Sequence, residues 1–399
     1  MGARRFLLQS LNWEEYMILN KTSLIAGLVG AAFAVSSAAQ AGGVPKKTAW
    51  TAYGTTSSGY AQAVAIGNML KKHYGTNLRV IPGKNDISRM APLRDKKAGY
   101  CACGIAAYFG QEGVFIFADK NWGPQPIRVL MTNIGSFGLS LATAKDANVK
   151  TMADMKGKRV SWVQGAPALN WNVAAQLSFA GLTWDDVEKV KVSGFAASFD
   201  AIINGQSDAA FSSTVSPSPK KLAASPRGLR WVPVPHNDSE GWKRMSAAAP
   251  VYGKVKAKIG SEIDKQNPPH LSNYPYPILV ANDSQDAGEV YAIVKAMVEH
   301  YDDYKNAAKG ALGWKLANQN MQWAMPYHDG AVKYYKEAGT WNAAAQKHQD
   351  MLLGRQEVIK KAWDAMSGKD SMSKEDLKAA WGKARVAALK AAGLDPIFN

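Results

Sequence analysis

The sequence lacks the residue patterns on which most enzyme active sites are built. It contains no Gly-x-Ser-x-Gly, His-Glu-x-x-His or Cys-x-x-Cys motif, and no nucleotide loop of the Gly-x-Gly-x-x-Gly or Gly-Lys-Ser/Thr kind. Its six histidines show no metal-ligand spacing. Paired carboxylates occur only as neighbours, at Asp185-Asp186 and Asp302-Asp303, where a helix start and a polar helix face account for them. The sequence therefore predicts a protein that is not an enzyme and that uses no cofactor or metal.

Cysteine is nearly absent, since the chain has only Cys101 and Cys103. They lie in the apolar stretch 100–105, which has the pattern of a buried strand, where residues two apart point the same way. This spacing favours free buried thiols. The alternative is a strained disulfide in an oxidising compartment. A metal site would need further ligands, and no histidine is close in sequence.

Long apolar runs are also missing, with one exception near the N-terminus. An uncharged run over 22–41 follows the basic Lys21 and ends in Ala39-Gln40-Ala41, which is the pattern of a secretory signal peptide. We expect export to the periplasm with cleavage after Ala41. We also expect Met17 to be the true start, because Glu14-Glu15 are acidic where a signal peptide is basic, so that 1–16 are a mis-called extension. A retained membrane anchor is the alternative, although Ala, Gly and Ser make a weak membrane span.

Acidic residues are few relative to basic ones, 32 against 48, and the net charge is +16. Such an excess can indicate nucleic-acid binding. Here the lysines are dispersed, no basic block with interleaved aromatic residues occurs, and the chain is predicted to be exported. These features exclude nucleic acid as the expected partner. The positive net charge is compatible with a solvated surface, an acidic partner or an anionic ligand.

The main positive signal is an alternation of strand and helix patterns, which predicts βαβ units, parallel sheets and a ligand crevice at the carboxyl ends of the strands. The predicted strands are 48–53, 78–81, 100–105, 127–133, 137–144, 160–163, 190–192, 209–211 and 229–234. The final third is predicted to be helical, over 290–300, 307–325, 330–339, 342–367 and 373–389.

A loop rich in hydroxyls and glycine follows the first predicted strand and opens a helix. Its sequence is Tyr53-Gly54-Thr55-Thr56-Ser57-Ser58-Gly59-Tyr60. Free backbone N–H groups and the positive end of the helix dipole make such a loop a site for a carboxylate or another anion. A simple helix cap is the alternative interpretation.

Several segments between about residues 47 and 341 form an ordered set of motifs. They are the loop 53–60, Val80-Ile81-Pro82-Gly83 with Ile87-Ser88-Arg89-Met90, Met152-Ala153-Asp154-Met155-Lys156-Gly157-Lys158-Arg159-Val160, Gly181-Leu182-Thr183-Trp184-Asp185-Asp186-Val187, the segments 199–211 and 290–296, and Pro326-Tyr327-His328-Asp329-Gly330-Ala331. Together they resemble the TAXI family of periplasmic substrate-binding proteins, which serve TRAP transporters. The tail after about Lys369 lies outside the resemblance.

This resemblance implies two α/β lobes, joined by crossing hinge strands, that close on a small ligand and deliver it to a membrane permease. The known ligands of the family are mainly small carboxylates. We therefore expect a type II periplasmic-binding-protein-like α/β architecture with a helical C-terminal region. Residues 42–136 and 245–345 are assigned to the first lobe, 137–244 to the second, and 346–399 to a C-terminal helical extension.

The candidate ligand-binding residues lie at predicted strand ends. In the first lobe they are Tyr53, Gly54, Thr55, Ser57, Ser58, Gly59, Tyr60 and Arg89; in the second lobe they are Trp162, Gln164, Gly165, Asn170, Trp171, Ser213 and Thr214; Tyr274 and Tyr276 complete the set. Arg89 is interpreted as a carboxylate clamp or as an internal salt bridge. Trp162 is either a pocket wall or part of a core. The two tyrosines form either an aromatic lid or proline-stiffened turns.

The predicted function is that of a periplasmic receptor that captures a small carboxylate-type ligand and delivers it to a TRAP-type permease. The alternative is a ligand sensor that docks on a membrane sensor kinase through the same pocket architecture. A permease gene next to this one would favour transport.

The predicted signal peptide can be tested directly. We expect protein isolated from the periplasm to have the intact mass of a chain that begins at Gly42, because cleavage follows the small-x-small end at Ala41. Mass spectrometry of the periplasmic and membrane fractions would measure this. A full-length chain in the membrane fraction would support the anchor instead.

Overall fold

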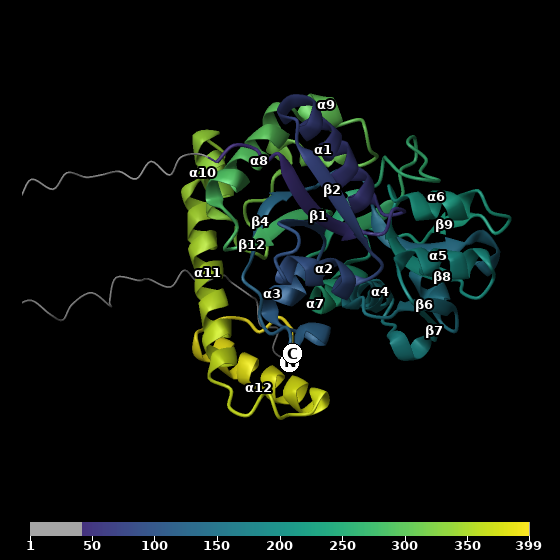
Figure 1. The fold of residues 1–399 in the computed structure, drawn as a ribbon. Helices are drawn as coiled ribbons and strands as arrows, with labels where there is room; N and C mark the ends of the chain where they lie inside the picture. Colours follow the sequence, from purple (N-terminus) through teal and green to yellow (C-terminus); the bar gives the residue numbers. More distant parts are fainter. Residues whose placement is uncertain (1–41, 399) are drawn as a thin grey trace, which may run out of the picture. The chain divides into compact units, whose positions relative to one another are not determined.

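The computed structural model describes residues 42–398, so the predicted signal peptide lies outside the described residues. Within this part, none of the helices combines the length and the apolar character that a membrane span requires. The described chain forms two mixed sheets surrounded by helices, followed by a helical C-terminal region (Figure 1). The predicted two-lobe α/β fold class is confirmed.

The first sheet has five strands in the order β2-β1-β3-β12-β4. They are β1 (Lys47–Tyr53), β2 (Asn77–Gly83), β3 (Tyr100–Cys103), β4 (Ile127–Thr132) and β12 (Ile278–Asn282). β1 runs parallel to β2 and β3, whereas β12 is antiparallel to both of its neighbours. The helices that accompany this sheet are α1 (Ser58–Tyr74), α2 (Asp86–Arg94), α3 (Ala106–Glu112), α8 (Ala287–Glu299), α9 (Tyr301–Tyr304) and α10 (Asp329–Glu337).

The second sheet has the order β10-β11-β5-β8-β6-β7, and β9 also pairs with β5. Its strands are β5 (Leu139–Ala144), β6 (Arg159–Val163), β7 (Glu188–Val192), β8 (Ala209–Ser213), β9 (Leu229–Trp231), β10 (Gly253–Lys256) and β11 (His270–Asn273). Its helices are α4 (Pro167–Phe179), α5 (Phe195–Ile203), α6 (Pro217–Ala223) and α7 (Ser239–Ala248). Pro167 occupies the start of α4, as its fixed φ and missing N–H favour.

One predicted lobe boundary differs from the structure. Strands β10 and β11 belong to the second sheet, although 245–345 was assigned to the first lobe. Ser272 of β11 lies opposite Leu139 of β5, and its hydroxyl donates to the Leu139 carbonyl at 2.8 Å. The chain therefore crosses between the sheets after β4, over 133–138, and after β11, over 274–277. Both strands are short and partly polar, so no apolar pattern marks them.

The helix predicted over 307–325 is also wrong. This segment contains only the short 3-10 helices η6 (Ala311–Trp314) and η7 (Leu316–Asn318). Its backbone carbonyls bond to side chains instead, since Asn133 donates to the Gly310 carbonyl at 3.0 Å. The Gln319 amide bonds in turn to both backbone groups of Thr132. Gly310 has a φ of +86°, a conformation that favours glycine and interrupts a helix.

Cys101 and Cys103 form a disulfide, so the expectation of free thiols is wrong. Both residues are fully buried in β3. Their side chains project from the same face of the strand with a Cα–Cα distance of 5.2 Å, which lies within the range that a disulfide spans.

The C-terminal region consists of α11 (Ala343–Asp364) and α12 (Lys374–Ala391), which pack on each other beside the first lobe (Figure 1). Their main polar anchor is Glu112 at the end of α3, a fully buried carboxylate. Arg355 of α11 donates to it at 2.7 and 2.8 Å, and Arg385 of α12 donates to the same carboxylate. The indole of Trp381 donates to the Gly113 carbonyl at 2.7 Å. One acidic residue thus holds both helices against the lobe.

We expect Glu112→Gln to lower the free energy of unfolding by about 3–5 kcal/mol, because it leaves two buried guanidinium groups without their counter-charge. The matched control is Glu357→Gln, which removes an exposed partner of Lys361. The control should stay within about 0.5 kcal/mol of the unaltered protein. Denaturant unfolding measures both variants, and equal losses would contradict the anchoring role of Glu112.

Candidate ligand-binding site

A cavity of about 20 Å³ lies between the two lobes, with room for about one water molecule. The first lobe contributes Tyr53 and Arg89, the second lobe contributes Ser213, and the crossing segment after β11 contributes Tyr274 and Tyr276. These five residues were all predicted from the sequence. The cavity lies where β1, β3 and β8 end, which is the edge at which α/β sheets bind ligands.

Arg89 is the central polar residue of this cavity. Asn85 and Ser88 form a reciprocal capping box at the start of α2 and so fix the turn of helix that carries Arg89. Only 1% of Arg89 is exposed, and its guanidinium lies 3.7 Å from the centroid of the Tyr53 ring. Its Nη2 donates to Asp86 Oδ1 at 2.9 Å. Nε and Nη1 have no hydrogen-bond partner among the described residues, so part of a buried cationic fork faces no protein acceptor.

The electrostatics keep this arginine charged. Burial opposes its charge, but the negative charge of the adjacent Asp86 carboxylate and its hydrogen bond favour the cation, and the pKa of Arg89 is raised above its ordinary value overall. Burial also raises the pKa of Tyr53 well above the ordinary range, with the Asp86 charge adding to the effect and Arg89 opposing it. Tyr53 therefore remains a neutral phenol that donates to Asp86 Oδ1.

Asp86 joins the two lobes. It is fully buried at the first position of α2, and its Oδ1 accepts from Tyr53 and Arg89. Its Oδ2 accepts from the backbone N–H of Ala168 in the first turn of α4, at 2.8 Å. The N-terminus of α4 thus binds a carboxylate of the first lobe, because that carboxylate matches the helix dipole and a free N–H group.

Tyr53 is the one residue of the loop 53–60 that lines the cavity, and residues 54–60 do not. Ser57 caps α1, since its Oγ accepts from the Tyr60 N–H at 3.2 Å. The Ser58 hydroxyl lies 3.3 Å from the hydroxyl of Ser216, a cavity residue of the second lobe. A Cβ atom on Gly59 would lie 3.9 Å from the Tyr276 hydroxyl.

Gly54 and Thr55 stand at the outer end of the loop, where Thr55 is exposed. The hydrogen bond from the Tyr60 N–H to the Ser57 hydroxyl shows that Ser57 is a helix cap, as the alternative interpretation held. A role of the neighbouring amides in anion binding stays a prediction.

Four predicted residues of the second lobe gather elsewhere. Trp162, Gly165, Asn170 and Trp171 line a separate groove of about 560 Å³, whose other wall includes the start of α12. The Asn170 amide accepts from the Val163 N–H at 2.9 Å and donates to the Val163 carbonyl at 3.0 Å, so it closes the end of β6.

Gln164 and Thr214 have structural contacts. The Gln164 carbonyl accepts from the Asn85 side chain at 3.1 Å, across the lobe boundary. The Thr214 hydroxyl donates to the Ile259 carbonyl at 2.8 Å and accepts from the Gly138 N–H at 3.0 Å. Neither side chain lines the cavity.

Several cavity residues were missed by sequence reasoning, among them Gly104, Asn172, Phe195 and Ser216. Asp86, which bonds to the cavity residues Tyr53 and Arg89, was missed as well. An aspartate at the first position of a helix is common for helix-dipole reasons alone, so Asp86 carries no distinctive signal. Gly104 is required because a Cβ atom there would lie 2.9 Å from the Tyr276 ring. Asn172 lies one turn beyond the predicted helix start and donates to the Tyr274 hydroxyl at 2.9 Å.

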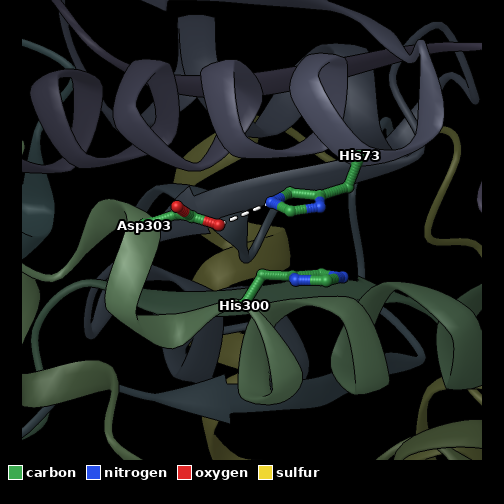
Figure 2. A group of neighbouring side chains, drawn as sticks. All are labelled: His73, His300 and Asp303. Carbon is green, nitrogen blue, oxygen red and sulfur yellow. Dashed lines mark hydrogen bonds and ion pairs between the residues drawn. The ribbon is translucent and has the colours of Figure 1, made fainter.

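His73, His300 and Asp303 form a group of possible metal ligands at the surface (Figure 2). The two imidazole rings stack at 3.6 Å between centroids with planes 13° apart. A metal ion lies in the plane of each imidazole that binds it, and two nearly parallel planes share no such point. Asp303 is held instead by Lys72 at 2.7 Å and by His73 at 2.5 Å. The group therefore ties α1 to α9 and does not have the geometry of a metal site.

The two α/β lobes are joined by two crossings, and a cavity lies between them. The model of the NMT1-like family matches residues 51–339, and the chain therefore belongs to this family.

Solved structures similar to this chain include three from bacteria. The alkanesulfonate-binding protein SsuA of Xanthomonas axonopodis pv. citri, bound to MOPS, shares 12% identity over 77% of this chain and 84% of its own, with a TM-score of 0.44. A structure concerning glutathione import by GshT and TcyBC of Streptococcus mutans shares 13% identity over 68% of this chain and 97% of its own, with a TM-score of 0.43. An amino acid ABC transporter substrate-binding protein of Streptococcus pneumoniae, bound to L-arginine, shares 12% identity over 67% of this chain and 94% of its own, with a TM-score of 0.40.

The raised pKa of Tyr53 predicts a change in alkaline stability. Above about pH 10 the unfolded chain loses this phenolic proton while the folded protein retains it, so the free energy of unfolding falls by about 1.4 kcal/mol per pH unit for each such tyrosine. Tyr53→Phe should make this alkaline slope shallower by that amount. Denaturant unfolding at several pH values measures the slope. From about pH 6 to about pH 8 the difference between the two proteins should be constant, and equal alkaline slopes would show that Tyr53 ionises while folded.

Proposed function

We propose that this protein is an exported solute receptor that captures one small carboxylate-type ligand between its two lobes. The observation that carries the proposal is the buried Arg89 guanidinium at the cavity wall, whose Nε and Nη1 find no acceptor within residues 42–398. A planar fork with free donors is complementary to a carboxylate, and a buried charge of this kind gains most from an ionised acceptor.

The cavity walls favour a small ligand with an apolar part. The Tyr53 and Phe195 rings stack at 5.8 Å with planes 9° apart and form one wall from both lobes. Tyr276 forms another part of the lining. Ser212 and Ser213, at the end of β8, contribute the second lobe's hydroxyl-bearing residues to the same lining. A ligand carboxylate on the first lobe and hydrogen bonds from the second would make binding depend on both lobes.

Entry of a carboxylate larger than one water requires the lobes to separate. Several hydrogen bonds cross the boundary, including Phe195 N–H to the Lys84 carbonyl at 3.0 Å and Ser218 N–H to the Thr56 carbonyl at 3.2 Å. We infer that this structure corresponds to the closed form and that the crossing segments 133–138 and 274–277 serve as the hinge. A ligand that contacts both lobes then shifts the population towards closure.

Delivery to a membrane transporter is the finer part of the proposal. The resemblance of the motifs to the TAXI family supports a TRAP-type permease and a periplasmic location. The Streptococcus pneumoniae neighbour, in contrast, is described as a component of an amino acid ABC transporter. Uptake of the identified ligand by cells that lack each candidate permease would distinguish the two transporter classes.

The ligand proposal predicts the effect of two matched arginine variants. Arg89→Lys keeps the charge but loses the planar fork, and we expect it to weaken binding at least about tenfold. Arg94→Lys makes the same chemical change in the same helix, where Arg94 bonds to Asp95 and the Asn121 carbonyl, and it should bind normally.

A thermal-shift screen of small carboxylates, amino acids and keto acids identifies the ligand, because a bound ligand stabilises the folded state. Calorimetry then compares the two variants. Unchanged affinity in Arg89→Lys would refute the clamp. Recovery of a chemically altered ligand after incubation would contradict a binding role.

A further inference from the structure

The chain does not end at α12 but continues into a short tail, residues 394–398, that returns to the boundary between the lobes. Phe398 is half-buried there among aromatic rings of both lobes. Its ring centroid lies 5.3 Å from that of Phe109 and 5.7 Å from that of Phe115, both in the first lobe. It also lies 6.3 Å from Trp171, which belongs to α4 in the second lobe. One C-terminal side chain therefore contacts both halves of the molecule.

The tail is fixed firmly on one side only. Arg385 donates to the Phe398 carbonyl at 2.6 Å, and Arg355 donates to the Asp395 carbonyl at 2.8 Å. Both arginines are bound by Glu112 of the first lobe. The tail is thus held to the first lobe by a buried charge network, whereas its contact with the second lobe through Trp171 is aromatic packing.

This asymmetry indicates which contact yields when the lobes separate. Edge-on aromatic pairs contribute far less than a buried charge network costs to break. Phe109 and Trp171 already touch across the boundary, with centroids 5.4 Å apart, and Phe398 completes a cluster around that pair. Opening would therefore pull Trp171 away from Phe398 while the tail stays on the first lobe.

We infer that the C-terminal tail is a strap that stabilises the closed arrangement of the lobes, with Phe398 as its contact point. The inference rests on the proposed lobe motion but not on the identity of any ligand. The strap opposes the separation of α4 from the first lobe. It does not affect the interior of either lobe.

Hydrogen–deuterium exchange of the full exported chain without ligand tests the strap. The amides of Ala168 and Ser218 report opening, because each donates across the boundary, to Asp86 Oδ2 and to the Thr56 carbonyl. We expect Phe398→Ala to speed their exchange about tenfold, since it removes contacts with four rings, those of Tyr108, Phe109, Phe115 and Trp171. The amides shared between β1 and β2, which lie within one lobe, should exchange as in the unaltered protein.

The matched control is Ile397→Ala, which truncates the neighbouring tail residue, 37% exposed. It should exchange as the unaltered protein does at both reporter amides. Unchanged exchange at Ala168 and Ser218 in Phe398→Ala would overturn the strap. An equal increase in β1 and β2 would also overturn it, because it would show general destabilisation. Since no ligand is used, an unsuccessful ligand screen would refute the proposed function and leave this result interpretable.

Discussion

The interaction on which the site depends is the buried pair of Asp86 and Arg89. A carboxylate and a guanidinium removed from water are costly unless each is neutralised and hydrogen-bonded. Asp86 meets this condition with three donors, from Tyr53, Arg89 and the Ala168 N–H. Arg89 meets it only in part, because two of its nitrogens have no acceptor among the described residues. This unequal satisfaction of the two partners is the reason for proposing a binding role for Arg89 and not only a structural salt bridge.

The same pair connects ligand binding with lobe position. Asp86 is carried by the first lobe and accepts from the Ala168 N–H at the start of α4 in the second, so this hydrogen bond forms only when the lobes are together. A ligand carboxylate on Arg89 would leave the bond between Asp86 and α4 in place, because the two anions use different donors. Two acceptors can therefore share one cationic region without competing for the same atoms, and closure strengthens both contacts by excluding water.

Much of the fold was predictable, because strong periodic patterns determine it. Buried strands such as β1 and the helix α1 that follows it appear with nearly the predicted bounds. The failures have local causes: β10 and β11 are short and partly polar, and 307–325 loses its helix to side-chain hydrogen bonds. At the site, Arg89 stood out in the sequence as an arginine near a predicted strand end of the first lobe. Asp86 did not, because its two functions depend on α4, which is distant in sequence and reaches it only through the tertiary fold.

The position of Glu112 has a consequence for how this chain can be divided. Glu112 lies inside the segment that matches the family, 51–339, but both of its arginine partners come from α11 and α12 beyond that segment. The family segment therefore lacks the arginines that neutralise Glu112. If this segment were produced alone, the carboxylate at the end of α3 would have neither of its two ion-pair partners. A relative without the two additional helices would need a different residue at this position. In this chain, the buried carboxylate of Glu112 thus couples the segment shared with the family to the extension that lies outside it.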